Sequence, residues 1–140
     1  MTAQNSIPLE ALPNGTVLKT PAYWAGMPFT HYGIVQRAWN GQVLIHHNSK
    51  KIGRATTTDF YGFADGNFAF VDSIPQTAGE GWLRAERARA DVERGIVWNV
   101  GENCEDMKSR ALTGRSGSPT REAFVGAGLF ALLLFALSKL

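Results

Sequence analysis

Hydrophobic and polar residues alternate over much of residues 16–47, which is the pattern of half-buried β-strands. Runs at 16–20, 31–37 and 42–47 are rich in β-branched and aromatic residues, and Asn40-Gly41 between the last two favours a hairpin turn. We therefore predict an antiparallel hairpin over 31–47. Pro21 is expected to close the first strand, and residues 22–28 are expected to form a loop. The Thr-rich stretch at 56–58 fits a strand or the start of a short helix, and residues 68–71 fit a further strand.

From residue 78 onward the pattern changes to the spacing of helices. Apolar residues recur at near-helical intervals up to Gly95, which stands where a helix commonly ends. A second helix is predicted over 103–114, with Asn103 as its N-cap, Asp106 in a capping-box position and Gly114 at its end. The only cysteine, Cys104, would then lie in the first turn of this helix.

The C-terminal segment predicts a hydrophobic helix. Ser118 and Pro119 form a typical helix start, and the run from Ala123 to Leu137 is continuously apolar. That run is roughly 22 Å long as a helix, against about 30 Å for the hydrocarbon core of a bilayer, so it is short for a membrane span. Two interpretations stay open: a membrane anchor in a locally thinned bilayer, or a helix packed on the domain.

Taken together, these elements predict one α+β domain, in which a small antiparallel β-sheet packs on helices. A chain of 140 residues is long enough for one hydrophobic core. We expect a flexible lead-in at 1–15, a catalytic domain at 16–114, and a basic linker with the hydrophobic C-terminal helix at 115–140.

Composition and charge narrow the function. The net charge of +2 argues against a nucleic-acid partner. The segment from Met107 to Arg121 is basic and free of acidic residues, which fits an anionic membrane surface. A single cysteine gives no disulfide and no zinc-ligand spacing, so neither a metal nor another cofactor is expected. The N-terminus has no basic and apolar start of a secretory signal, which favours a cytoplasmic location.

Cys104 is the candidate nucleophile. A thiol at a helix N-terminus lies near free backbone N–H groups, which lower its pKa and can stabilise an oxyanion. The only histidines, His31, His46 and His47, all lie on the predicted hairpin. His31 begins one strand and the other two end its partner, so a general base and a group that orients it are available side by side. The alternative is that Cys104 is an inert core residue, as most free cysteines are.

Three short motifs in chain order carry a family resemblance. "HYGIV" at 31–35, "IHHNS" at 45–49 and "NCED" at 103–106 resemble the LRAT-like family, which comprises lecithin retinol acyltransferase and enzymes of the phospholipase A/acyltransferase type. The resemblance implies a permuted papain-like fold of the NlpC type. It also implies that Cys104 is the nucleophile and His31 the general base. The orienting third member is His47 if "His-Asn-Ser" is the matching motif, and His46 if the count starts at "VLI"; we favour His47.

This sequence also departs from the family. Asp106 and Met107 stand where family members commonly have His and Phe, and the spacing between the two histidines is longer than usual. The expected function is a thiol-dependent acyltransferase or phospholipase A that forms an acyl-thioester on Cys104, with a phospholipid or other acyl donor at a membrane surface. The alternatives are a cysteine amidase or peptidase of the same fold, and a non-enzymatic membrane-associated module.

Overall fold

The computed structural model describes residues 8–99 and 101–139, and they form an α+β fold, as predicted. Its antiparallel sheet has five strands in the order β4-β3-β2-β1-β5. The strands are β1 (Val17–Trp24), β2 (Met27–Arg37), β3 (Val43–Ser49), β4 (Arg54–Thr58) and β5 (Phe70–Ser73). The helices are α1 (Phe60–Ala64), α2 (Ala78–Glu93), α3 (Cys104–Thr113) and α4 (Pro119–Leu137).

The predicted hairpin is confirmed as β2 and β3, which pair from Gly33↔His47 to Arg37↔Val43 around a turn at Asn40-Gly41. The Thr-rich stretch is a strand, β4. The loop predicted for 22–28 is wrong, because β1 continues through Pro21 to Trp24 and a two-residue turn leads into β2. Pro21 is tolerated because β1 pairs with β5 only as far as Lys19, so the missing N–H removes no bond from that ladder.

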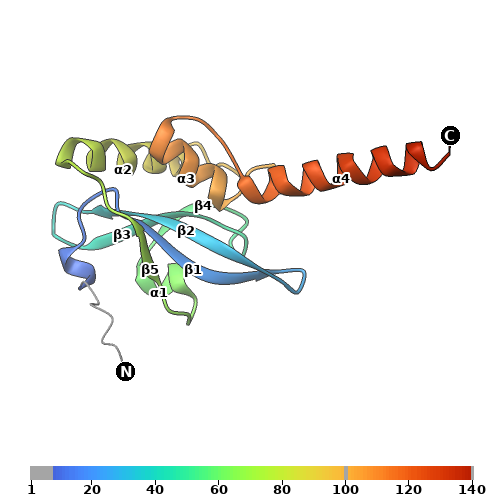
Figure 1. Cartoon of the computed structure of the whole chain (residues 1–140). Coiled ribbons are helices and arrows are strands. Elements are labelled where there is room, and N and C mark those ends of the chain that lie inside the picture. Colours follow the sequence, from blue (N-terminus) through green and yellow to red (C-terminus); the bar gives the residue numbers. More distant parts are fainter. Residues whose placement is uncertain (1–7, 100, 140) are drawn as a thin grey trace, which may run out of the picture.

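Helices cover both faces of the sheet (Figure 1). The short helix α1 lies on one face, where Phe63 packs with Val35 and Ile45. On the other face α2 and α3 lie side by side, and Met107 and Ala111 of α3 pack with Ile34 of β2. Strand β2 therefore contributes odd-numbered residues to the α1 face and even-numbered residues to the face of α2 and α3.

The predicted helix ends are confirmed. The Asn103 side chain accepts hydrogen bonds from the amides of Glu105 and Asp106, the Asp106 carboxylate accepts from the Asn103 amide, and Gly114 ends α3 with a left-handed backbone. Ser118 caps α4, and Pro119 is its first residue. These local sequence signals fix where Cys104 enters α3.

The expected flexible lead-in at 1–15 is in part a packed segment. Residues 1–7 lie outside the described residues, but Leu9–Ala11 forms a short 3-10 helix and Leu12 is buried in the core. The chain then presses against α2 so closely that a Cβ at Gly15 would lie 2.4 Å from the carbonyl oxygen of Gly81.

Helix α4 extends away from the domain beyond its first turn (Figure 1). Seven of its large apolar side chains are between 52% and 66% exposed: Leu129, Phe130, Leu132, Leu133, Leu134, Phe135 and Leu137. The interpretation that this helix packs on the domain is therefore wrong. Within 8–99 and 101–139, no helix combines the length and the apolar character needed to cross a membrane.

Candidate active site

Two of the three histidines meet on the α1 face of the sheet. Because Gly33 pairs with His47, His31 lies two residues further along β2 on the same face, diagonal to His47. Nε2 of His31 lies 3.0 Å from Nδ1 of His47, and both rings are buried. The structure thus brings together His31 and the favoured second histidine.

A chain of hydrogen bonds fixes which nitrogens carry protons. Thr58 of β4 donates its hydroxyl hydrogen to the Asp59 carbonyl oxygen at 2.9 Å, so Thr58 Oγ1 accepts from His47 Nε2 at 2.8 Å. His47 Nδ1 is then unprotonated and accepts from Nε2 of His31. With Nε2 protonated, Nδ1 of neutral His31 keeps its lone pair, so Nδ1 is the atom that can take a proton.

Phe63 of α1 holds both imidazole rings in place. Its ring stacks on His31 with centroids 5.2 Å apart and meets His47 edge to face at 5.4 Å. Asp59 caps α1, because its side chain accepts a hydrogen bond from the Gly62 amide. Asp59 therefore both ends the chain of hydrogen bonds from His31 and fixes the helix that carries Phe63. Gly33 leaves room for this ring, since a Cβ there would lie 2.8 Å from Phe63 Cε2.

His46 lies away from this pair and has its own partners. It points to the opposite face, where Nε2 contacts Gln36 Oε1 at 2.5 Å and Nδ1 contacts Thr57 Oγ1 at 2.7 Å. Gln36 in turn donates to Glu86 of α2 at 2.9 Å. Both ring nitrogens are satisfied by the framework, so His46 joins β2, β4 and α2 and does not contact His31 by a hydrogen bond.

Cys104 lies against the backbone of β2 on either side of His31. Its Sγ donates to the Thr30 carbonyl oxygen at 3.4 Å, and the Tyr32 amide donates to the sulfur. These two backbone groups are available because β3 pairs with β2 only from Gly33 onward. The thiol therefore occupies a gap in the β2–β3 ladder, at the edge of the strand that carries His31.

Among the described residues, no hydrogen bond joins Sγ of Cys104 to the His31 ring. Helix α3 approaches from the face opposite to α1, whereas the His31 ring lies on the α1 face. The sulfur instead contacts the backbone of Thr30 and Tyr32, the residues immediately before and after His31.

The predicted lowering of the Cys104 pKa is wrong for this structure. The side chain is only 2% exposed, and burial raises the thiol pKa to about 12, although backbone N–H groups of Tyr32, Cys104 and Glu105 act in the opposite direction. Burial also lowers the pKa of His31 to about 4 and that of His47 to about 3. At neutral pH the site therefore holds a neutral thiol and neutral imidazoles.

A pocket of about 420 Å³ opens onto the two histidines. Its lining includes His31, His47 and Phe63 together with Lys50 and Lys51, but not Cys104. In the described chain, no group of three or more His, Cys, Asp or Glu side chains is arranged to hold a metal ion. The pocket therefore presents two imidazoles between apolar and basic side chains, while the thiol lies outside its lining.

Thr58 and Phe63 were not identified from the sequence. If residues 56–58 form a strand, Thr56 and Thr58 point to one face of the sheet and Thr57 points to the other. That alternation is the available signal, but only the β3–β4 register, which pairs Ile45 with Thr58, shows that Thr58 lies beside His47. Nothing in the sequence indicates that Phe63 reaches His31.

Comparison with known proteins identified no relative of this chain. No family model matches the chain, and neither a curated protein nor a solved structure matches it. The functional assignment therefore depends on the geometry of the site.

Proposed function

We propose that this chain is a thiol-dependent acyl hydrolase or acyltransferase of the LRAT-like type, with an acyl-thioester on Cys104. The observation that carries the proposal is the hydrogen-bonded pair of His31 and His47 beside the strand edge at which Cys104 lies. A nucleophile, a base and a group that orients the base are the three parts that acyl transfer by a thiol requires. The permuted papain-like relationship belongs to the same proposal.

The reaction starts from neutral groups. The Cys104 thiol first leaves its contact with the Thr30 carbonyl and turns toward His31. Its proton then passes to Nδ1 of His31 as the sulfur attacks the carbonyl carbon of an acyl ester. The carbon–oxygen bond to the leaving alcohol then breaks, and the alcohol takes the proton from Nδ1. Water or another nucleophile, deprotonated by the same Nδ1, attacks the thioester and releases Cys104 as a thiol.

His47 stabilises the protonated form of His31. When Nδ1 takes a proton, His31 becomes a cation, and its Nε2–H remains bonded to His47 Nδ1. Thr58 keeps His47 from turning, because it holds His47 Nε2. Backbone N–H groups at the start of α3 lie near the sulfur and are suited to stabilise the oxyanion.

A lipid ester is the favoured substrate. The exposed apolar helix α4 follows a basic segment, which fits contact with an anionic lipid surface. The pocket at the histidines combines apolar side chains such as Phe29 and Phe63 with Lys50 and Lys51. Such walls suit an acyl chain together with an anionic head group.

The test is covalent trapping of the acyl group. After incubation with a phospholipid, intact-mass and peptide spectra should show an acyl adduct on Cys104, and Cys104→Ser should give neither the thioester nor turnover. Turnover that is unchanged in Cys104→Ser would contradict the proposal. Turnover of peptide substrates without turnover of lipid esters would replace it with the amidase alternative.

A further inference from the structure

The first turn of α4 is tied to the first turn of the helix that carries Cys104. Arg121 holds the Asp106 carboxylate with both ends of its guanidinium, Nη1 to Oδ2 at 2.7 Å and Nη2 to Oδ1 at 3.0 Å. Asp106 is completely buried, so this two-pronged contact neutralises a charge that has no access to water. Removing Arg121 would leave that carboxylate without its ion-pair partner.

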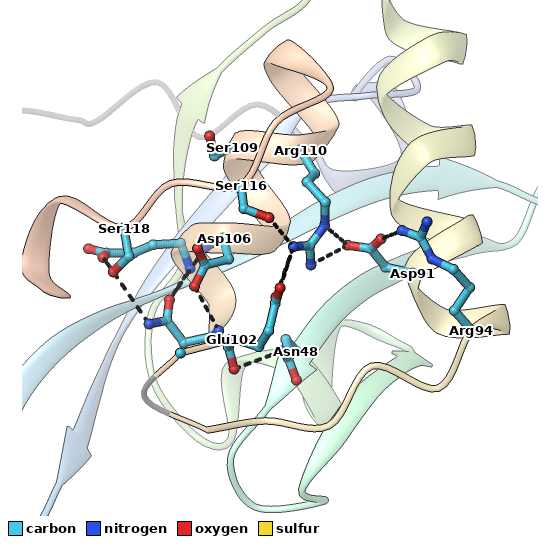
Figure 2. A network of polar contacts seen from close by, with 12 residues as sticks. Asn48, Asp91, Arg94, Glu102, Asp106, Ser109, Arg110, Ser116 and Ser118 are labelled. Carbon is cyan, nitrogen blue, oxygen red and sulfur yellow. Dashed lines mark hydrogen bonds and ion pairs between the residues drawn. The ribbon is translucent and has the colours of Figure 1, made fainter. Parts of the chain in front are cut away.

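Ser118 makes a second connection between the same two turns (Figure 2). This buried residue caps α4 and also accepts from Asn103 Nδ2 at 3.3 Å, while its hydroxyl contacts the Glu105 carboxylate. Arg121 adds a hydrogen bond to the Gly101 carbonyl oxygen at 2.9 Å. Helix α4 therefore contacts the chain immediately before, at and after the start of α3.

These contacts fall on the capping groups that define where α3 begins. Asp106 Oδ2 accepts both from Arg121 and from the Asn103 amide, and Asn103 precedes Cys104. Any movement of Arg121 thus acts on the cap that sets the backbone of Cys104. Because the sulfur fits between the Thr30 carbonyl and the Tyr32 amide, a small shift of that backbone changes its approach to His31.

We propose that Arg121 and Ser118 are positioning residues for Cys104, so that the first turn of α4 is part of the active site as well as the start of the C-terminal helix. The inference depends on the proposed function for its catalytic consequence. The claim that Arg121 sets the accessibility and geometry of the Cys104 thiol does not depend on the substrate.

The experiment compares Arg121→Gln with Arg54→Gln in the full-length protein. Arg54 is an exposed arginine at the start of β4, outside the basic segment and outside the lining of the histidine pocket. With a short-chain soluble ester and no lipid, Arg121→Gln should lower kcat by about 10- to 100-fold with KM within about twofold. Arg54→Gln should match the wild type, and Arg121→Lys, which keeps the charge, should recover part of kcat.

A second measurement does not require turnover. Iodoacetamide should alkylate Cys104 several times faster in Arg121→Gln than in Arg54→Gln, because the thiol loses part of its enclosure. If Arg121→Gln does not fold, Ser118→Ala replaces it in both measurements. Unchanged kcat and alkylation in the folded variant would overturn the positioning role. If the wild type shows no Cys104-dependent turnover, the proposed function fails, and the alkylation rates still decide this inference.

Discussion

At the scale of single residues, the chain of hydrogen bonds from His31 through His47 and Thr58 to Asp59 distinguishes His47 from His46. His47 has one nitrogen on His31 and the other on Thr58, whereas His46 bonds to Thr57 and Gln36 on the opposite face. Two adjacent residues of the same type therefore have different roles, because successive side chains of a strand point to opposite faces.

Replacing each of these histidines with leucine should separate their roles. His47→Leu should lower kcat/KM by about 10²-fold or more, because His31 loses the acceptor that fixes its protonated nitrogen. His46→Leu should leave kcat/KM of the folded protein nearly unchanged but lower the free energy of unfolding by about 1–3 kcal/mol, since Thr57 and Gln36 lose a buried partner. Steady-state kinetics and urea denaturation measure both effects. Equal kinetic losses in the two variants would contradict the assignment of His47.

The raised pKa of Cys104 predicts how its reactivity varies with pH. With a thiol pKa of about 12, the thiolate fraction is small at neutral pH and increases about tenfold per pH unit. The rate of alkylation by iodoacetamide should therefore rise steadily between pH 6 and 9 without reaching a plateau. The same protein in urea is the control, because its exposed thiol should level off near an ordinary pKa of about 8.5. A plateau below pH 7 in the native protein would indicate a thiolate–imidazolium pair instead.

At the scale of secondary-structure elements, strand β2 organises the site. It carries His31 toward α1, and it offers the Thr30 and Tyr32 backbone to Cys104. Gly33, the next residue of the strand, lets Phe63 and Ile45 approach closely. The alternation of the hairpin and the caps of α3 were readable in the sequence. The gap in the β2–β3 ladder was not, because it depends on where β3 stops pairing with β2 and continues with β4.

A methyl group at Gly33 should disturb this arrangement. The Cβ of Gly33→Ala would lie 2.5 Å from Ile45 Cγ2 and 2.8 Å from Phe63 Cε2, so the Ile45 side chain and the Phe63 ring that stacks on His31 must both shift. We expect a loss of about 1–3 kcal/mol in the free energy of unfolding and a lower kcat. Gly79→Ala in α2 is the matched control, because its Cβ would meet nothing within 4 Å. A Gly33→Ala protein as stable and active as this control would contradict the packing described for Phe63.

At the scale of the whole molecule, the chain consists of a packed domain and a helix that extends from it (Figure 1). The apolar side chains of α4 are exposed along its length, while its first turn is fixed to α3 through Arg121 and Ser118. A surface of this kind, placed next to a basic segment, is suited to contact with lipid head groups and acyl chains.

Liposome binding should therefore depend on α4. We expect the full-length protein to sediment with anionic liposomes, and Leu133→Ser combined with Leu134→Ser to weaken binding by about 100-fold or more, since burying each leucine contributes about 1.5–3 kcal/mol. Trp82→Ser, which alters an exposed apolar residue of α2, should bind as the wild type does. Binding by the double variant equal to that of the wild type would contradict a role for α4 in lipid contact.

Local sequence patterns were enough to predict several elements, because their signals act over a few residues. These are the alternation of the β2–β3 hairpin, the capping box of Asn103 and Asp106, and the start of α4 at Ser118. The sequence also singled out Cys104, His31 and His47 as candidates. Contacts between distant segments could not be predicted in this way. Three features of the site are of this kind: the burial that raises the Cys104 pKa, the Thr58 hydroxyl that fixes the His47 tautomer, and the Arg121–Asp106 contact. Each depends on residues brought together by strand register and helix packing, which no local pattern encodes.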